Sequence, residues 1–189
     1  MKSFKLFVTA IFIILGICSV KAQSTEIDFG IKAGANLSNL NTGVDAVTGK
    51  WGKVGFNAGI FGRIGKAFYL QPELNYISFN DKFSYRATSY EVTFNQVNIP
   101  LSVGYKIINT AALIFRVSVG PDFYYNLKDP ISPDGSKYKY FTLGKLINIG
   151  VDLGNLTLDA RYSLGYNQFN EGLNQKSNLF SLDIGIKFQ

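Results

Sequence analysis

The sequence predicts an all-β protein, an eight-stranded antiparallel transmembrane β-barrel preceded by a cleavable signal peptide. Eight stretches of roughly ten residues carry apolar side chains at every second position, which is the period of a β-strand. The connections between these stretches alternate between long and short, and aromatic residues gather near their ends. Short turns on one side, long loops on the other and two aromatic girdles are typical of outer-membrane barrels.

The N-terminus predicts a secretory signal peptide over residues 1–22. Two lysines precede an uncharged apolar run, and small residues stand three positions and one position before the expected cleavage. We expect cleavage between Ala22 and Gln23, which leaves one barrel domain over residues 23–189. The apolar run of about a dozen residues is short of the roughly 20 that a membrane-spanning helix needs, so a transmembrane anchor is the weaker interpretation.

The signal peptide holds the only cysteine, Cys18. Its neighbour Ile17 is larger than the residue that precedes a lipid-modified cysteine, which disfavours a lipoprotein. The mature chain therefore has no thiol or disulfide chemistry. Loss of three lysines with the signal peptide leaves 16 of the 19 basic residues against 13 acidic ones. No cluster of basic residues interleaved with aromatic ones remains, and we expect no nucleic-acid partner.

The alternation places the strands and their connections in order along the chain. Strands are expected at 26–37, 54–64, 68–79, 90–105, 112–125, 140–153, 156–166 and 178–188. Long polar loops are expected at 38–53, 80–89, 126–139 and 167–177, and short links at 65–67, 109–110 and 154–155. Since outer-membrane barrels keep their short turns in the periplasm, this order predicts the bacterial outer membrane with both mature termini periplasmic.

Tilted by about 45°, ten residues of strand span roughly 23 Å, close to the apolar band of such barrels. Aromatic residues fall where the two membrane interfaces would lie. The outer girdle is expected to hold Phe56, Tyr76, Tyr90, Phe123, Tyr125, Phe141 and Tyr166, and the periplasmic girdle Phe29, Phe68, Tyr105 and Phe188. Aliphatic residues fill the middle, as in a membrane-facing belt.

A water-soluble barrel of the lipocalin type also alternates, but it turns its apolar side chains inward. Its second face would meet water and should be rich in Lys, Glu and Thr. Here the second face of the first two strands is instead rich in glycine and asparagine, for example Gly30, Gly34, Asn36, Gly55 and Asn57. Such small residues suit a narrow lumen, which favours the membrane barrel.

The face opposite the apolar one collects six acidic and six basic residues. They are Asp28, Lys32, Arg63, Glu73, Lys106, Arg116, Asp122, Asp152, Asp159, Arg161, Asp183 and Lys187. Side chains just fill the interior of an eight-stranded barrel, so buried charges have to pair. We expect a structural ion network built around Glu73, Arg116, Asp152, Asp159, Arg161 and Asp183, in which Arg161 pairs with Asp159, Asp183 or Glu73. The alternative is a conducting or substrate-binding pore.

Three prolines lie inside expected strands, Pro72, Pro100 and Pro121. Each lacks the N–H that a sheet ladder uses, and a closed barrel has no free edge on which to place it. We therefore expect a local β-bulge at each proline.

The composition argues against an enzyme. The chain contains no histidine, which excludes Ser-His-Asp, Cys-His and histidine–metal chemistry. The acidic residues of the loops, such as Asp129, Asp134 and Glu171, are too scattered for a calcium site. Carboxylate pairs such as Asp152 and Asp159 are more simply structural beside an arginine. We expect no catalytic, cofactor-binding or metal-binding residues and no cofactor.

Several segments together resemble one family, the PorT-like outer-membrane β-barrel domain proteins of Gram-negative bacteria, over essentially the whole mature chain. The matching segments are Ile31-Lys32-Ala33-Gly34-Ala35-Asn36-Leu37, Leu70-Gln71-Pro72-Glu73-Leu74-Asn75-Tyr76, Val97-Asn98-Ile99-Pro100-Leu101 with Tyr105, Gly120-Pro121, and Leu158-Asp159-Ala160-Arg161-Tyr162 with Gly165. The last strand ends in Phe188, although Gln189 follows where such barrels usually finish on the aromatic residue. The resemblance implies an outer-membrane barrel and, for the namesake, a part in type IX secretion.

The leading hypothesis is a structural or surface-interaction scaffold without catalytic activity, which acts through its outer loops. Candidate contacts to a partner or to lipopolysaccharide phosphates lie around Trp51, Phe83-Ser84-Tyr85-Arg86 and Lys137-Tyr138-Lys139-Tyr140. An ordinary rim of tyrosines and lysines at the headgroup level explains the same residues. Expected partners are outer-membrane lipid, lipopolysaccharide and envelope or secretion-complex proteins. The alternatives are an accessory subunit of a type IX-like secretion complex and a narrow pore.

Overall fold

The computed structural model describes residues 26–42, 47–52, 54–85, 88–127, 140–165 and 175–188. Side chains are described within 26–38, 54–80, 93–127, 140–165 and 178–188, and the backbone alone elsewhere in these ranges. The expected signal peptide with Cys18, the cleavage site at Ala22 and Gln23, and the terminal Gln189 lie outside the described residues. Among the described residues, no helix has the length and hydropathy of a membrane-spanning segment.

In the described part of the chain, nine strand segments build one antiparallel sheet. They are β1 (Ile27–Thr42), β2 (Val47–Gly52), β3 (Val54–Ile64), β4 (Phe68–Tyr85), β5 (Thr88–Asn109), β6 (Leu113–Asn126), β7 (Phe141–Leu153), β8 (Leu156–Gly165) and β9 (Gln175–Phe188). Eight of them follow one another in the order β4-β3-β1-β9-β8-β7-β6-β5, and the pairing of β4 with β5 closes the ring. The predicted eight-stranded barrel is therefore confirmed. The ninth segment, β2, pairs with β4 beyond the end of β3.

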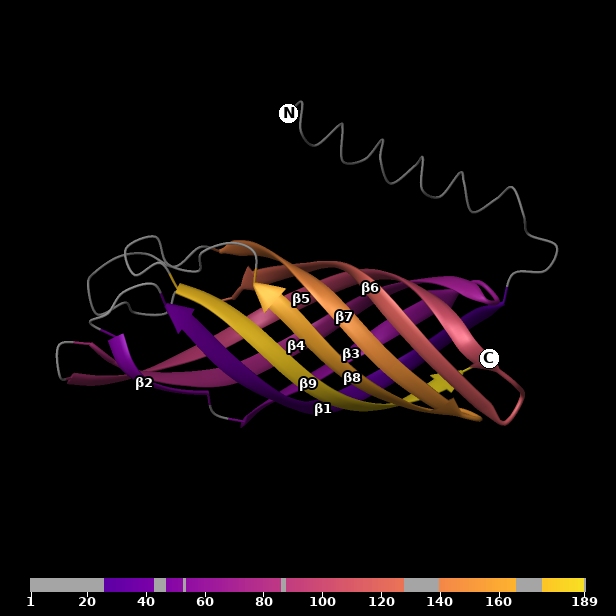
Figure 1. Cartoon of the computed structure of the whole chain (residues 1–189), viewed down its shortest axis with the longest axis horizontal. Coiled ribbons are helices and arrows are strands. Elements are labelled where there is room, and N and C mark those ends of the chain that lie inside the picture. The colour runs from indigo at the N-terminus through magenta and orange to yellow at the C-terminus, as the bar shows by residue number, and fades with distance from the viewer. Residues whose placement is uncertain are drawn as a thin grey trace, which may run out of the picture.

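The barrel is long and has two different ends (Figure 1). At one end, here called the turn end, β1 begins, β9 finishes, and short links at 65–67, 110–112 and 154–155 join the strands. The opposite end, here called the loop end, holds the other connections. Two links need glycine because their φ angles are positive, 129° at Gly65 and 58° at Gly154.

The strands reach further at the loop end than the sequence predicted. The expected loops at 38–53 and 80–89 were wrong, because β1 continues to Thr42, β2 occupies 47–52, and β4 and β5 extend to Tyr85 and Thr88. Their Asn-, Ser- and Lys-rich composition resembles a loop. Backbone pairing to the neighbouring strand nevertheless makes these residues parts of strands. The other expected long loops fall largely on 128–139 and 166–174, outside the described residues.

The two faces of the wall alternate as predicted. In β7, the outward residues Ile147 and Ile149 are 50% and 48% exposed, whereas inward Leu146 and Asn148 are each 2% exposed. Of the aromatic residues predicted for the two girdles, the exposed ones are Phe56, Tyr76, Tyr125 and Phe141 toward the loop end, and Phe29, Phe68, Tyr105 and Phe188 at the turn end. Phe123 is half-buried, and the side chains of Tyr90 and Tyr166 lie outside the described residues. Apolar side chains outside and polar ones inside exclude the water-soluble barrel.

The prolines do not produce the expected bulges. Within the described strands the register is the same before and after each one: β3 pairs Phe61 with Glu73 and Ile64 with Leu70 on either side of Pro72. The ladders at Pro100 and Pro121 also keep their register. The expectation of bulges was wrong. Each proline lacks the N–H that would donate a ladder hydrogen bond, but its strand accommodates it without an extra residue. The one register shift in the β5–β6 ladder lies between Lys106 and Ile108 instead.

Inward glycines make room for large inward side chains directly across the ladder. Gly150 is paired with Arg116, and a Cβ atom on it would lie 2.4–2.6 Å from the Arg116 guanidinium. Gly104 stands in the same relation to Tyr69, where the closest ring atom would be 2.3 Å away. The glycines of this face therefore set the space in which the buried charges are arranged.

Candidate functional site

The structure brings all twelve predicted inward charges into the lumen. Each is at most 5% exposed, although they come from eight different strands. Alternation explains this placement, since each one occupies the inward phase of its strand. Ion pairs join ten of these twelve residues into two clusters. Each cluster contains three of the six residues predicted for the ion network.

The first cluster lies toward the turn end and contains three cations and three anions, Arg63, Arg116, Lys187, Asp28, Asp152 and Asp159. Asp152 is its centre, with Oδ2 2.6 Å from Arg63 Nη1 and Oδ1 3.1 Å from Arg116 Nε. Arg116 Nη2 also lies 2.8 Å from Asp159 Oδ2. Longer contacts of 3.5–3.9 Å bring in Lys187 and Asp28. The formal charges of this group cancel.

The second cluster contains Lys32, Glu73, Arg161 and Asp183. Glu73 Oε2 lies 2.6 Å from both Lys32 Nζ and Arg161 Nη2, and Lys32 Nζ lies 3.4 Å from Asp183 Oδ2. Arg161 thus pairs with Glu73, one of the three carboxylates proposed from the sequence. This cluster is also neutral in formal charge, which is how a low-dielectric interior tolerates ions.

A glutamine joins the two clusters. Gln71 Oε1 accepts a 2.8 Å hydrogen bond from Arg63 Nε, and Gln71 Nε2 donates a 2.7 Å bond to Glu73 Oε1. Gln71 is 1% exposed. The six residues predicted for the ion network did not include Gln71. The alternation of the strand could have indicated its role: Gln71 and Glu73 are two residues apart, so both side chains point into the lumen.

Two of the predicted charges lie apart from the clusters. Lys106 Nζ is 2.8 Å from Glu26 Oε2, a residue just before β1. Asp122 accepts hydrogen bonds from three neutral groups, the Asn98 amide and the hydroxyls of Tyr124 and Ser163. Nearer the loop end, the polar part of the lumen therefore relies on hydrogen bonds to amides and hydroxyls.

Toward the loop end, the lumen contains a group of buried apolar side chains. Ile77, Phe79, Phe94 and Leu179 point inward and are 3–5% exposed. The rings of Phe79 and Phe94 stack with centroids 5.1 Å apart and planes at 21°. At the turn end, a hollow of about 400 Å³ is lined by Asp152 and Lys187 among others, so the first cluster forms part of its wall.

On β4 and β5, the wall reverses its polarity beside this apolar layer. On the outer face beside it, Tyr76 Oη and Ser78 Oγ both donate hydrogen bonds to Asn95 Oδ1, at 2.8 and 3.0 Å. Below this level the outer face is apolar and the inner face polar, as a membrane requires. Above it, the described residues of β4 and β5 show the reverse order, with Ser78, Asn80, Thr93 and Asn95 on the outer face and Phe79 and Phe94 inside. Polar side chains on the outer face of these two strands suit contact with water better than contact with lipid.

A three-stranded sheet continues beyond that level. The pairing of β5 with β6 ends at Gln96 and Asn126, whereas β5 stays paired with β4 as far as Thr88 and Tyr85. β2 adds to the other edge of β4. Figure 1 shows β4 and β5 passing beyond the ends of the other strands, with β2 beside them. We call this β2–β4–β5 extension the projecting sheet.

Of the proposed loop contacts, the structure describes one side chain. Tyr140 is 51% exposed, and its ring stacks on Tyr125 with centroids 6.2 Å apart. Trp51 and residues 83–85 belong to strands whose side chains lie outside the described part, as do residues 86 and 137–139. The described residues contain no group of three or more His, Cys, Asp or Glu positioned to hold a metal ion.

Solved structures of outer-membrane barrels resemble this fold. OprG of Pseudomonas aeruginosa superposes with a TM-score of 0.56 at 11% identity, covering 86% of this chain and 96% of that one. Neisserial surface protein A gives 0.53 at 18% identity, with 85% and 97% covered. The attachment invasion locus protein Ail of Yersinia pestis gives 0.51 at 13% identity, with 86% and 99% covered. At these identities the likeness concerns the fold alone.

No curated protein sequence matches the chain significantly. The family model described as "Outer membrane protein beta-barrel domain" matches residues 21–171, most of the chain. That match agrees with the closed ring, the apolar outer face and the paired charges of the lumen. The chain belongs to the outer membrane protein beta-barrel domain family and is an outer-membrane β-barrel protein.

Proposed function

We propose that this protein is a non-catalytic surface-interaction scaffold that presents its projecting sheet outside the cell. The turn end and both mature termini then lie in the periplasm, after removal of residues 1–22. The observation that carries this proposal is the reversal of polarity on β4 and β5 at Tyr76 and Asn95, beyond which the described outer residues Ser78, Asn80 and Thr93 are polar. A barrel that only needed to cross the membrane would have no use for the roughly 25 Å of strand between Asn95 and Thr88.

The packed lumen supports a scaffold over a pore. Two neutral ion clusters and the apolar layer lie one after another along the lumen. The carboxylates of the clusters are engaged by arginine and lysine, which supports a structural role over acid–base catalysis. The proposed scaffold has no cofactor.

Cysteine labelling tests the orientation. Thr93 is exposed on β5 at the start of the projecting sheet, and Lys66 is exposed in the β3–β4 link at the turn end. With a membrane-impermeant maleimide on intact cells, Thr93→Cys should be labelled, and Lys66→Cys only after the outer membrane is permeabilised. The reverse result would refute the proposed orientation.

A deletion tests the role of the sheet. Replacing residues 80–93 by an Asn-Gly turn keeps the stacked Phe79 and Phe94 and removes the tip of the hairpin. We expect an intact barrel, seen as the usual mobility difference between unheated and boiled samples on a gel, that has lost surface attachment to its partner. Attachment that survives the deletion would contradict the scaffold proposal.

The resemblance to PorT-like proteins supports a second candidate, an accessory subunit of a type IX-like secretion complex. Native extraction in mild detergent separates the two. A particle much larger than one barrel with its detergent, and of unchanged size after the 80–93 deletion, favours the complex held through the barrel wall or the periplasmic side.

A further inference from the structure

One charged side chain breaks the rule that governs this wall. Within 26–38, 54–80, 93–127, 140–165 and 178–188, twelve charged residues on strands point into the lumen, and Lys145 on β7 alone points outward. Its neighbours follow the rule, since Leu146 is inward and Ile147 outward. A charge on the lipid-facing side of a membrane protein is costly and is commonly kept for a function.

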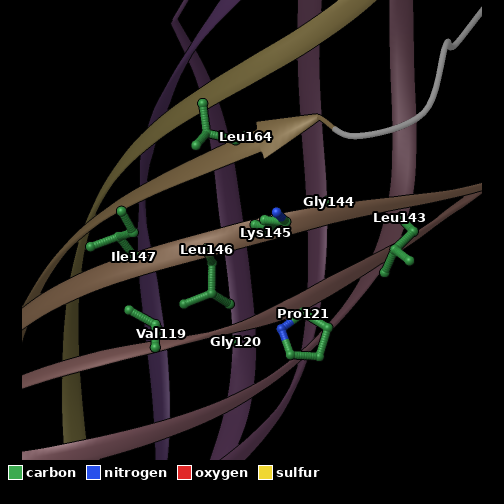
Figure 2. A pocket seen from close by; sticks show the side chains of 9 residues that line it. All are labelled: Val119, Gly120, Pro121, Leu143, Gly144, Lys145, Leu146, Ile147 and Leu164. Carbon is green, nitrogen blue, oxygen red and sulfur yellow. The ribbon is translucent and has the colours of Figure 1, made fainter.

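Lys145 stands in a hollow of the outer wall of about 560 Å³, here called the β6–β8 hollow. Its sides are apolar and come from three adjacent strands: Val119 and Pro121 on β6, Leu143 and Ile147 on β7, and Leu164 on β8. In the register, Lys145 lies between Pro121 and Leu164. Figure 2 shows the side chains that line the hollow and labels Gly120 and Gly144, which line it as well. Its size is that of a small-ligand site.

The position of Lys145 along the wall identifies the leaflet. It lies four residues from Phe141, which is paired with Tyr125 in the loop-end girdle. Four residues of tilted strand correspond to a depth of roughly 9 Å below that girdle. The long stem of a lysine lets its ammonium group reach up toward the headgroup level while its methylenes stay in the apolar region.

We propose that the β6–β8 hollow binds a phosphorylated, acylated lipid of the leaflet at the loop end, with one acyl chain in the hollow and a phosphate on Lys145 Nζ. The apolar hollow complements the acyl chain of such a lipid, and the lysine cation complements its phosphate. Because the proposed function places the loop end outside, the ligand is the phosphorylated lipid A part of lipopolysaccharide. The proposal adds a specific lipid site to the scaffold and rests on that orientation.

Lipid retention by the full-length protein tests the site. The protein is purified from outer membranes in mild detergent, incubated with bis-phosphorylated lipid A, and the bound lipid is counted by native mass spectrometry. Lys145→Gln should lower retention at least tenfold, and Lys145→Arg should retain the lipid because it keeps the charge. The matched control Lys66→Gln removes an exposed lysine of the turn end and should bind as the wild type does.

The hollow itself is tested by filling it. Val119→Trp should abolish retention, whereas Ile149→Trp, at another outward position of similar exposure outside the hollow, should not. Unchanged retention in Lys145→Gln, equal loss in Lys66→Gln, or equal binding of dephosphorylated lipid A would each overturn the proposal. A dimer disrupted by Val119→Trp would overturn it too, because a second copy would then occupy the hollow.

The orientation and the lipid site fail in distinguishable ways. Phosphatidylglycerol retained in preference to lipid A would overturn the assignment of the ligand. Maleimide labelling of Thr93→Cys and Lys66→Cys reports the orientation without reference to any lipid. Correct labelling with no lipid A retention would therefore remove the lipid site and leave the scaffold in place.

Discussion

The Nη2 atom of Arg161 lies 2.7 Å from Oε1 and 2.6 Å from Oε2 of Glu73, a residue 88 positions away in the sequence. The same carboxylate holds Lys32 and accepts from Gln71 and Asn75. One glutamate thus ties β1, β4 and β8 together across the lumen. Loss of such a shared partner leaves charges buried without compensation.

Glu73→Gln is therefore expected to destabilise the barrel by about 3–5 kcal/mol, the range for breaking a buried ion pair from one side. The measurement is urea unfolding in detergent, followed by circular dichroism. The double variant Glu73→Gln/Lys32→Gln should recover part of the loss, because it removes one of the stranded cations. A single variant as stable as the wild type would show that these ions are not buried together.

Gln71→Leu should cost about 1–3 kcal/mol, because Arg63 Nε and Glu73 Oε1 each lose a buried hydrogen-bond partner. Ser102→Ala on the neighbouring strand is the matched control, since the Ser102 hydroxyl makes only a 3.4 Å contact to the Gln71 carbonyl. The same unfolding measurement applies. Equal effects of the two substitutions would argue against Gln71 as the link between the clusters.

Gly150→Ala should destabilise the barrel by about 1–3 kcal/mol through overpacking. The added methyl group would meet the Arg116 guanidinium, which hydrogen bonds to Asp152, Thr157 and Asp159 hold in place. Gly62→Ala is the control, because its nearest neighbour, a ring atom of Phe29, is 3.6 Å away. If both variants unfold at the wild-type urea concentration, Arg116 moves more freely than its contacts indicate.

Val117→Arg should cost about 2–4 kcal/mol, because Val117 faces lipid near the middle of the wall. Val54→Arg, at the loop end of β3 and 70% exposed, should cost only about 0–1 kcal/mol. Refolding into lipid vesicles gives both values. A negligible effect at Val117 would mean that the outer face does not contact lipid at that depth.

Planar-bilayer recordings should show no stepwise conductance for the wild type. Ion flow would have to pass both the charged clusters and the stacked Phe79 and Phe94. A porin in the same bilayers serves as the positive control. Regular conductance steps from the purified barrel would revive the narrow pore that the sequence left open.

The sequence alone determined the fold and the sorting of side chains, because a strand period of two assigns every residue of a strand to one of two faces. It also placed all twelve charges in the lumen. Alternation does not decide which charges meet. Tertiary structure paired Arg161 with Glu73 and not with Asp159, its neighbour on β8, because the tilt and stagger of the strands bring residues of different strands to one level.

Tertiary structure also decided the length of the projecting sheet and the accommodation of the prolines. The polar sequence of residues 88–95 is typical of a loop, and only its pairing with β4 makes it a strand. Lys145 also shows what the sequence determines and what only the tertiary structure decides. Its outward phase can be read from the sequence, but the hollow around it exists only because Pro121 and Leu164 lie beside it on neighbouring strands, and that proximity depends on the register of three strands.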